Sequence, residues 1–113
     1  MNKFRGELEV TLNQTTYKTR LTIDGIVRLE HQLNMSILEV AHRLSEVTLH
    51  IGQVVQILHV ALRGGGNDLD QKQVGELVFE AGLVEGIRVC GEILANCLNA
   101  GNGGDEGNGQ AGE

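Results

Sequence analysis

The sequence contains no proline and no tryptophan, and only two phenylalanines and one tyrosine among its 113 residues. Proteins that hold single-stranded nucleic acid stack its bases on aromatic side chains, and this chain has almost none. Its net charge of −6 also disfavours a polyanionic partner. We therefore expect no nucleic-acid partner, and a core built from Leu, Val and Ile.

Long apolar runs are missing as well, since none approaches the roughly 20 residues that a helix needs to cross a bilayer. The apolar segment of a secretory signal peptide does not follow Met1. These absences predict a soluble protein that stays in the compartment where it is made, with no membrane partner. A chain of 113 residues is the size of one domain with a modest core.

Cysteine is scarce, with only Cys90 and Cys97 present, seven residues apart in a segment that reads as helical. At about 1.5 Å of rise per residue, their Cα atoms would lie about 10 Å apart, beyond the roughly 7 Å that a disulfide can bridge. The pattern predicts two reduced core thiols, which is typical of a cytosolic protein.

Residues 6–22 alternate apolar and polar side chains with the period of a β-strand, which predicts a hairpin with one covered face. With Gln14-Thr15 as its loop, Leu12 would face Tyr17 and Val10 would face Thr19. The next pair on that face would be Leu8 with Leu21. An isolated two-stranded hairpin is marginally stable in water, so helices must cover it. The predicted inner face consists of Leu8, Val10, Leu12, Tyr17 and Leu21.

Residues 23–99 read as four or five short helices separated by capping residues and glycines. One helix begins near Thr22, another follows a Ser36–Glu39 capping box, and the last runs roughly from Leu83 to Leu98. The fold class is therefore α+β, a single domain over residues 1–99 in which an N-terminal hairpin packs on a helical bundle. The predicted N-caps are Thr22, Ser36, Thr48 and Asp68, and the predicted breaks are Asn34, Gly64-Gly65-Gly66 and Gly82.

The segment of residues 100–113 differs in composition from the rest of the chain. It reads AGNGGDEGNGQAGE, in which six of fourteen residues are glycine and the only charges are acidic. Such a segment has too little apolar area to offset the entropy of ordering it. We predict a disordered acidic tail.

Two of the predicted helices are apolar over an unusually wide arc. Ile57 and Val60 lie away from the main stripe of their helix, Phe79 lies off its own stripe, and polar residues cover little of the last helix. One interpretation is that the last helix is a central core helix; the other is a contact surface for a partner or for a second copy of the chain. The predicted partner-binding residues are Ile57, Val60, Phe79, Val89 and Ile93.

Residues that could carry out chemistry are few and scattered. The four histidines fall on three predicted helices, and the two that share a helix, His50 and His59, point to opposite sides of it. The triple glycine lacks the G-K-[ST] of a phosphate loop, Asp68 and Asp70 lack the pattern of a calcium loop, and no Ser or Cys sits in a nucleophile motif. We therefore expect a protein that is not an enzyme and has no metal site and no cofactor.

Four elements in a fixed order resemble a known family. They are the start Arg5-Gly6-Glu7, the hairpin that closes on Arg20-Leu21-Thr22, the short helix pair around residues 34–44, and the run from Ala61 to Gly66. Together they are similar to the tail assembly chaperones of gene transfer agents and long-tailed, siphovirus-like phages. The similarity covers most of residues 4–98.

The resemblance implies a non-enzymatic protein of the bacterial host cytoplasm, made when a prophage or a phage-like particle is expressed. Relatives are thought to bind the helical tape-measure protein and to recruit tail-tube subunits. Wide apolar faces suit such a helical partner, and an acidic exterior keeps an oligomer soluble. Two alternatives remain: a structural tail component retained in the particle, for which one hairpin is little β-structure, and a small helical adaptor or regulatory protein.

Overall fold

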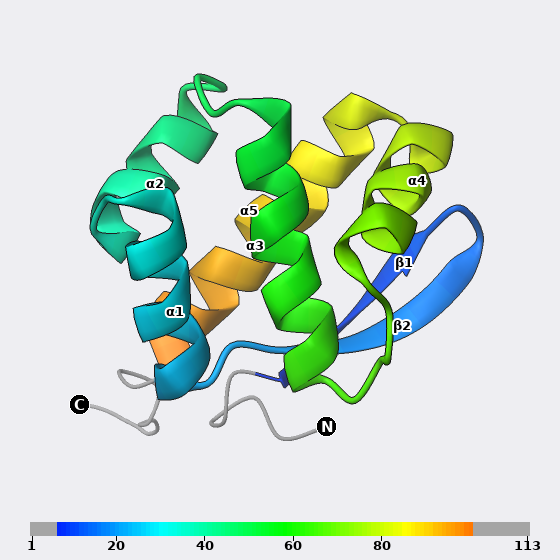
Figure 1. Ribbon diagram of the computed structural model, residues 1–113, viewed down its shortest axis with the longest axis horizontal. Helices are drawn as coiled ribbons and strands as arrows, with labels where there is room; N and C mark the ends of the chain where they lie inside the picture. The colour runs from blue at the N-terminus through cyan, green and yellow to red at the C-terminus, as the bar shows by residue number, and fades with distance from the viewer. Residues whose placement is uncertain (1–6, 101–113) are drawn as a thin grey trace.

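The N-terminal hairpin packs on five helices in the computed structural model, which describes residues 7–100 (Figure 1). This arrangement confirms the predicted α+β fold. The other residues of the predicted domain, 1–6, and residues 101–113 of the predicted tail lie outside the described part of the chain. The elements are β1 (Glu7–Leu12), β2 (Thr15–Arg20), α1 (Ile23–Leu33), α2 (Ile37–Ser45), α3 (Ile51–Gly64), α4 (Gln71–Ala81) and α5 (Leu83–Ala100).

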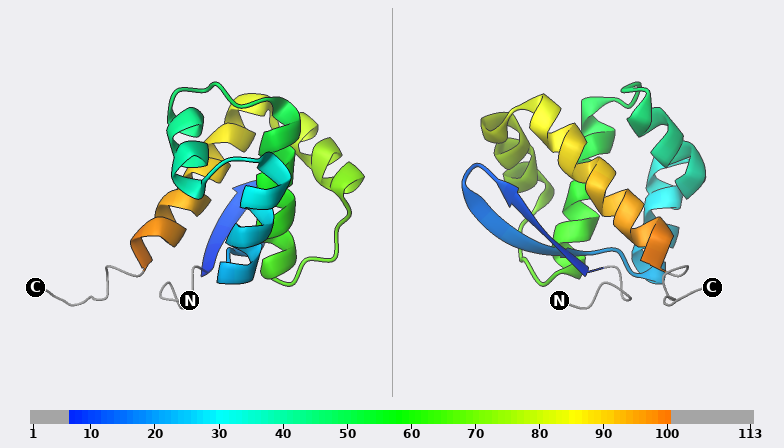
Figure 2. Two further views of the ribbon diagram at one scale, coloured as in Figure 1. Left: turned by 60° about the vertical axis from the view of Figure 1, so that its left-hand side comes forward. Right: turned by 180° about the vertical axis from the view of Figure 1, so that it is seen from behind.

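Helices α3 and α5 cross at the centre of the molecule. The pair α1 and α2 lies to one side of this crossing, and α4 and the hairpin lie to the other (Figures 1 and 2). Helix α3 contacts α1, α4, α5 and β2, and α5 contacts α2, α3, α4 and both strands. Because neighbours cover these two helices on several sides, each needs apolar residues over most of its circumference.

The register of the hairpin differs by two residues from the prediction. Val10 pairs with Tyr17 and Leu8 with Thr19, and the turn is Asn13-Gln14, where both residues have positive φ (51° and 70°). Two positive φ values define the type I′ turn, whose twist matches that of the strands and which favours Asn at its first position. A shift of two residues keeps every side chain on its own face.

The face of the hairpin toward the helices is buried as predicted. Val10, Leu12 and Leu21 are each at most 3% exposed, while Leu8 and Tyr17 are partly buried against the same core. Thr19 is the one fully buried polar residue in the described part of the chain, and its hydroxyl donates a 2.7 Å hydrogen bond to the carbonyl oxygen of Leu8. This bond offsets the cost of burying a hydroxyl group.

The start of α1 and the link between α1 and α2 follow the sequence prediction. The Thr22 hydroxyl accepts from the backbone N–H of Gly25, and Asn34 ends α1 in the left-handed conformation (φ 55°). Ser36 caps α2 by accepting from the N–H of Glu39. The reciprocal half of that capping box is absent from the described residues, because the Glu39 carboxylate binds Arg43 instead. Glu30 of α1 takes its place and accepts a 2.8 Å bond from the N–H of Ile37.

Two predicted caps are wrong by two residues. The N-cap of α3 is His50, not Thr48, whose hydroxyl instead donates to the Arg43 carbonyl at the end of α2. The N-cap of α4 is Asp70, not Asp68. Asp70 accepts from the N–H of Gln73, and the Gln73 side chain accepts from the N–H of Asp70. This D-x-x-Q box lies two residues further along the chain than the D-x-x-Q pattern that begins at Asp68.

Glycines at the end of α3 allow the helix to approach the hairpin closely. A Cβ atom at Gly64 would overlap the carbonyl oxygen of Arg20, and one at Gly65 would overlap that of Lys18. The Asn67 side chain then donates to the carbonyl oxygens of Lys18 (2.7 Å) and Leu62 (3.0 Å). The triple glycine is therefore a packing contact between backbones as well as the end of a helix.

Helix α5 begins after Gly82 (φ 102°), as predicted. It packs against both strands of the hairpin, and mainly against β1. Its Asn96 side chain donates a 3.1 Å hydrogen bond to the carbonyl oxygen of Glu7, and the Cys97 sulfur lies 3.8 Å from the carbonyl oxygen of Leu21. The last helix is thus joined to the first strand, 89 residues earlier in the chain.

Candidate functional site

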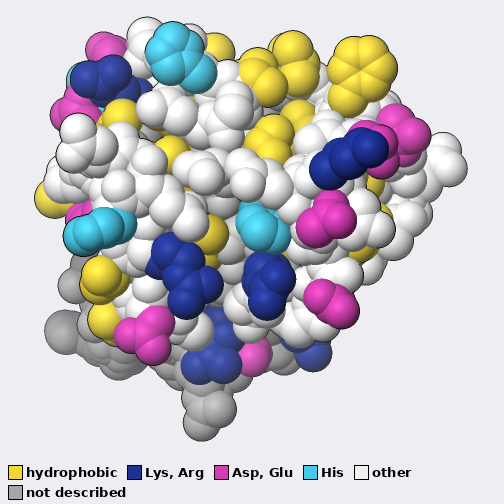
Figure 3. Space-filling view, in the orientation of Figure 1, with side chains coloured by type: hydrophobic (Ala, Val, Ile, Leu, Met, Phe, Trp, Pro, Cys, Tyr) yellow, Lys and Arg dark blue, Asp and Glu magenta, His cyan; other side chains and the backbone are white. Residues whose placement is uncertain are grey.

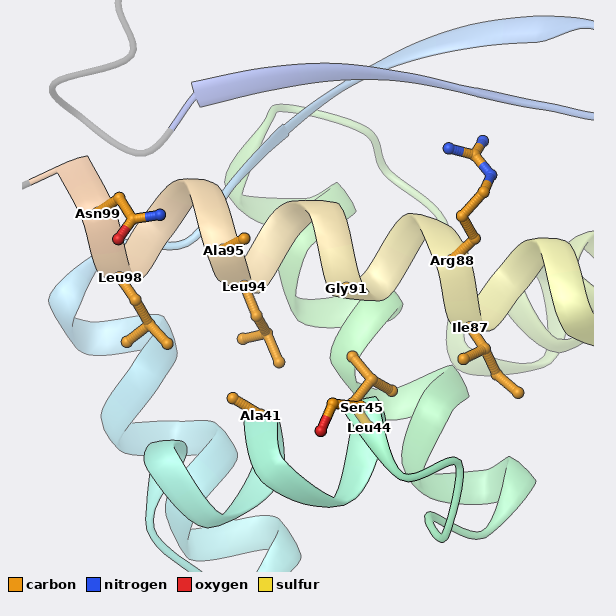
Figure 4. Close-up of a pocket in the computed structure, with 10 residues that line it drawn as sticks. All are labelled: Ala41, Leu44, Ser45, Ile87, Arg88, Gly91, Leu94, Ala95, Leu98 and Asn99. Carbon is orange, nitrogen blue, oxygen red and sulfur yellow. The ribbon is translucent and has the colours of Figure 1, made fainter.

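An apolar groove lies between α2 and α5 (Figure 4). Its volume is about 480 Å³. In Figure 4 the side chains of Ile87, Leu94 and Leu98 point from α5 toward α2, and Ala41 points back toward α5. We call this the α2–α5 groove; its lining comprises Ala41, Leu44, Ser45, Ile87, Arg88, Gly91, Leu94, Ala95, Leu98 and Asn99.

The positions of the two helices that form the groove follow from local interactions. Glu30 and Ser36 cap the start of α2, while Val40 and Leu44 bury its inner side (0% and 5% exposed). Gly91 leaves α5 without a side chain where it passes α2, and a Cβ atom there would meet the Leu44 side chain at 3.9 Å. The groove is therefore open at Gly91, which has no side chain, whereas Ile87, Leu94 and Leu98 on the same face of α5 carry apolar side chains.

Ion pairs within single helices hold the charged groups near the groove. Arg88 donates to Glu85 and to Glu92, and it points away from α2 in Figure 4. The hydrogen bond from Arg88 holds the pKa of Glu85 below its usual range, and the bond to Glu85 raises the pKa of Arg88 further. On α2, the hydrogen bond from Arg43 lowers the pKa of Glu39 in the same way. The rest of the groove lining is mainly apolar.

Four of the five predicted partner-binding residues are buried in the core, so their assignment to the surface is wrong. Ile57, Val89 and Ile93 are at most 1% exposed and Val60 is 9% exposed. The wide apolar arcs have a packing explanation, since α3 and α5 are covered on several sides. A Cβ atom at Gly25 of α1 would lie 3.2 Å from the Val60 side chain, which shows how closely α1 covers that residue.

Phe79 is the one predicted site residue that lies on the surface, with 79% of its area exposed. Leu83 and Val84 at the start of α5 are exposed as well (44% and 81%). Figure 3 shows apolar side chains gathered over this turn between α4 and α5. Ile87 lies one helical turn beyond Leu83, so the exposed apolar residues at the turn continue into the α2–α5 groove.

The sequence interpretation missed the groove because it chose the wrong edge of the last helix. A helical signal was available: Leu83, Ile87, Gly91, Leu94 and Leu98 follow one another at intervals of four, four, three and four residues. Such spacing places them on one face of α5. Val89 and Ile93 belong to the opposite face, which packs on the core.

The thiol of Cys90 is buried and that of Cys97 is partly buried. Burial raises the pKa of Cys90 to about 12 and also raises that of Cys97, so both thiols are protonated near neutral pH. No three His, Cys, Asp or Glu side chains between residues 7 and 100 come together as a metal site would require. Within the same range, no helix is long and apolar enough to cross a membrane.

Comparison with known families adds one match. Residues 5–100 match the sequence profile of a family described as phage tail tube protein, GTA-gp10. The matched region includes the hairpin and all five helices. Neither the curated proteins nor the solved structures contain a significant match.

Proposed function

The chain belongs to the phage tail tube protein family GTA-gp10, and we propose that it is a tail assembly chaperone. In this role it binds the tape-measure protein, helps to recruit tail-tube subunits, and carries out no enzymatic step. The bacterial host cytoplasm is where such a protein would act. The resemblance described in the sequence analysis supports the chaperone role, and the family match supports the broader assignment to phage tails.

The α2–α5 groove is the observation that carries this proposal. A long helical protein such as a tape measure presents apolar side chains at i, i+3, i+4 and i+7, and proteins that bind such helices do so through apolar grooves. Here Leu44, Ile87 and Leu98 supply apolar walls, and Gly91 leaves room for an incoming side chain. The exposed Phe79, Leu83 and Val84 extend the apolar surface beyond the groove.

The surface charge supports the same role. A chaperone that covers apolar segments must itself remain in solution, and a net charge well away from zero favours this. The chain carries −6 at pH 7. The same apolar surface can also bring copies of the chain together, so a homo-oligomer that opens to receive the tape measure is part of the proposal.

The second candidate function is a structural component of the tail, because the matched family is described as a phage tail tube protein. Tube and capsid folds are generally built from sandwiches or barrels with many strands, whereas the described residues form one two-stranded sheet. Quantitative mass spectrometry of purified particles separates the two candidates. A chaperone is absent from finished particles, while a tube component is present in many copies.

The test of the groove is to fill it. In the Gly91→Leu variant, a leucine side chain would occupy the groove beside Leu44, and its Cβ atom would lie in ordinary contact, 3.9 Å from the Leu44 side chain. Helix propensity would improve by about 1 kcal/mol. The matched control is Gly75→Leu on α4, where a Cβ atom meets nothing within 4 Å. Each variant is co-expressed with the tape-measure protein of the same gene cluster, and soluble tape measure is quantified after affinity capture of the chaperone.

We expect Gly91→Leu to fold and to lose the tape measure to the insoluble fraction, and Gly75→Leu to behave as the parent chain. Circular dichroism and thermal melts serve as the control that both variants are folded. If folded Gly91→Leu keeps the tape measure soluble as well as the parent does, the α2–α5 groove is not its binding site. If the parent chain itself does not solubilise the tape measure, the chaperone function is wrong.

A further inference from the structure

A second concavity, between α1 and α3, is lined by basic side chains. Its volume is about 350 Å³, and three arginines and one histidine border it: Arg20, Arg28, Arg63 and His59. The single acidic residue in its lining is Asp24, in the first turn of α1. We call this the arginine pocket. Figure 3 shows the dark blue side chains gathered on this face, over the lower parts of α1 and α3 and beside a histidine.

Two of these arginines have no partner within residues 7–100. Neither Arg28 nor Arg63 takes part in an ion pair or a side-chain hydrogen bond there, whereas Arg43 and Arg88 elsewhere on the surface are each paired with glutamate. His59 is held in place, because its Nε2 lies 3.0 Å from the carbonyl oxygen of Leu69. The pocket thus keeps two guanidinium groups exposed and without an ion-pair partner among residues 7–100.

The concentration of positive charge is unusual for this chain. The protein has only nine Lys and Arg against fifteen Asp and Glu, yet three of those nine line one pocket. Like charges repel one another, so holding the unpaired Arg28 and Arg63 beside one pocket costs stability, and a ligand of opposite charge would offset this repulsion. Guanidinium groups match carboxylates and phosphates in geometry, with two parallel N–H donors for the two oxygens of a carboxylate.

A polypeptide ligand is favoured over nucleic acid. The pocket lining contains no Phe, Tyr or Trp on which a base could stack, and its one imidazole, His59, is held against the Leu69 carbonyl oxygen. The net charge of −6 also repels a long polyanion. Residues 24, 28 and 32 follow one another along α1 at intervals of one helical turn, so the pocket extends about 12 Å beside the helix. That length accommodates three or four residues of an extended peptide.

We propose that the arginine pocket binds an acidic segment of a partner polypeptide, whose carboxylates are held by Arg28 and Arg63. The pocket lies on a different side of the molecule from the α2–α5 groove: α1 and α3 face the viewer in Figure 1, and α5 faces the viewer in the reverse view of Figure 2. The chain therefore presents an apolar surface and a cationic surface that two different protein segments can occupy at once. This inference does not depend on the chaperone function.

The test uses a fluorescently labelled hexaglutamate peptide and the full chain, with binding followed by fluorescence anisotropy at about 20 mM NaCl, where charge interactions are weakly screened. The test variant is Arg28→Gln with Arg63→Gln. The control is Arg43→Gln with Lys72→Gln. It also removes two positive charges, but from exposed positions outside the pocket. A labelled hexaglutamine peptide and a labelled single-stranded oligonucleotide serve as comparison ligands.

We expect the pocket variant to weaken hexaglutamate binding by about tenfold or more, equivalent to at least about 1.4 kcal/mol, and the control to change it by about twofold or less. Hexaglutamine should not bind. Equal weakening in both double variants would show a general effect of net charge and would overturn the proposal, as would preferential binding of the oligonucleotide. So would self-association that is lost in the pocket variant without any peptide binding, because the occupant would then be a second copy.

One more variant addresses the acidic residues of the chain itself. Asp105→Asn with Glu106→Gln removes two carboxylates from the segment that follows α5. If hexaglutamate binds only to this variant and not to the parent chain, the pocket is occupied by the chain's own segment, and the proposal of a partner polypeptide is overturned. Similar binding to both forms supports it.

Discussion

Gly64 at the end of α3 lies directly against the backbone of Arg20 at the end of β2, with no space between them for even one Cβ atom. Gly65 makes the same contact with Lys18. The hairpin is therefore joined to the central helix by backbone packing and by the two Asn67 hydrogen bonds, in addition to its apolar face. This junction ends beside the arginine pocket, which Arg20 and Gly64 help to line.

Substitution of Gly64 by Ala should destabilise the fold, because the new methyl group would overlap the Arg20 carbonyl oxygen. We expect a loss of about 1–3 kcal/mol in the free energy of unfolding, measured by urea denaturation. The control is Gly75→Ala, a helical glycine with open space around it, which should gain up to about 1 kcal/mol. A parent-like stability of Gly64→Ala would show that α3 and β2 lie farther apart than described.

The Val10→Asp variant tests the covered face of the hairpin. Val10 is 3% exposed beneath the helices, and a carboxylate there would lack both water and a partner. We expect a cost of several kcal/mol, enough to unfold most domains of this size, visible as loss of the cooperative thermal transition. The Thr11→Asp control on the exposed face should stay folded. Val10→Asp melting like the parent would contradict the orientation of β1.

Ile57 and Phe79 should respond very differently to the same substitution. Ile57 is fully buried, so Ile57→Ser should cost about 2–5 kcal/mol through lost burial and a cavity. Phe79 is 79% exposed, so Phe79→Ser should stay within about 0.5 kcal/mol of the parent. Chemical denaturation of the two single variants measures both values. Comparable costs would mean that one of these burial assignments is wrong.

The Cys90 thiol should make the protein less stable in alkaline solution. Burial raises its pKa from the usual 9.0 to about 12, so between these values the unfolded chain loses a proton that the folded chain keeps. The free energy of unfolding should therefore fall as the pH rises from 9 toward 12, by up to about 1.4 kcal/mol per pH unit from this group alone. Urea denaturation at pH 8 and pH 10.5 measures the fall. The Cys90→Ala variant should show a smaller one; an identical fall would exclude Cys90 as its source.

Local signals in the sequence were sufficient for much of the fold. Alternation with period two located both strands and their inner face, and Thr22, Asn34, Ser36 and Gly82 marked helix ends where they occur. The two errors of capping arose because Thr48 and Asp68 are also good cap residues, and the choice between neighbouring candidates depends on tertiary contacts. The hairpin register shifted for a related reason: Asn13-Gln14 accepts two positive φ values, and the face pattern is the same for either turn.

The candidate site was harder to predict than the fold. The wide apolar arcs of α3 and α5 are compatible with a central position in the core and with a surface that binds a partner. A helical wheel cannot distinguish the two, because it does not show which other elements pack against the helix. Ile57 and Val60 turned out to face helices that pack on α3 from several sides. The arginine pocket could not be seen at all, because Arg28 and Arg63 are 35 residues apart and meet only when α1 packs on α3.

The contact of Asn96 with Glu7 has a consequence for how the chain is made. The ribosome synthesises β1 first and α5 last among the described elements, yet α5 supplies much of the cover of β1. Helix α3 can cover β2 earlier, but the nascent chain carries β1 without its α5 cover until all the other described helices have been translated. Closure of α5 on β1 therefore comes late relative to the synthesis of the hairpin, and the apolar face of β1 is the part of the emerging chain most in need of protection from other nascent chains.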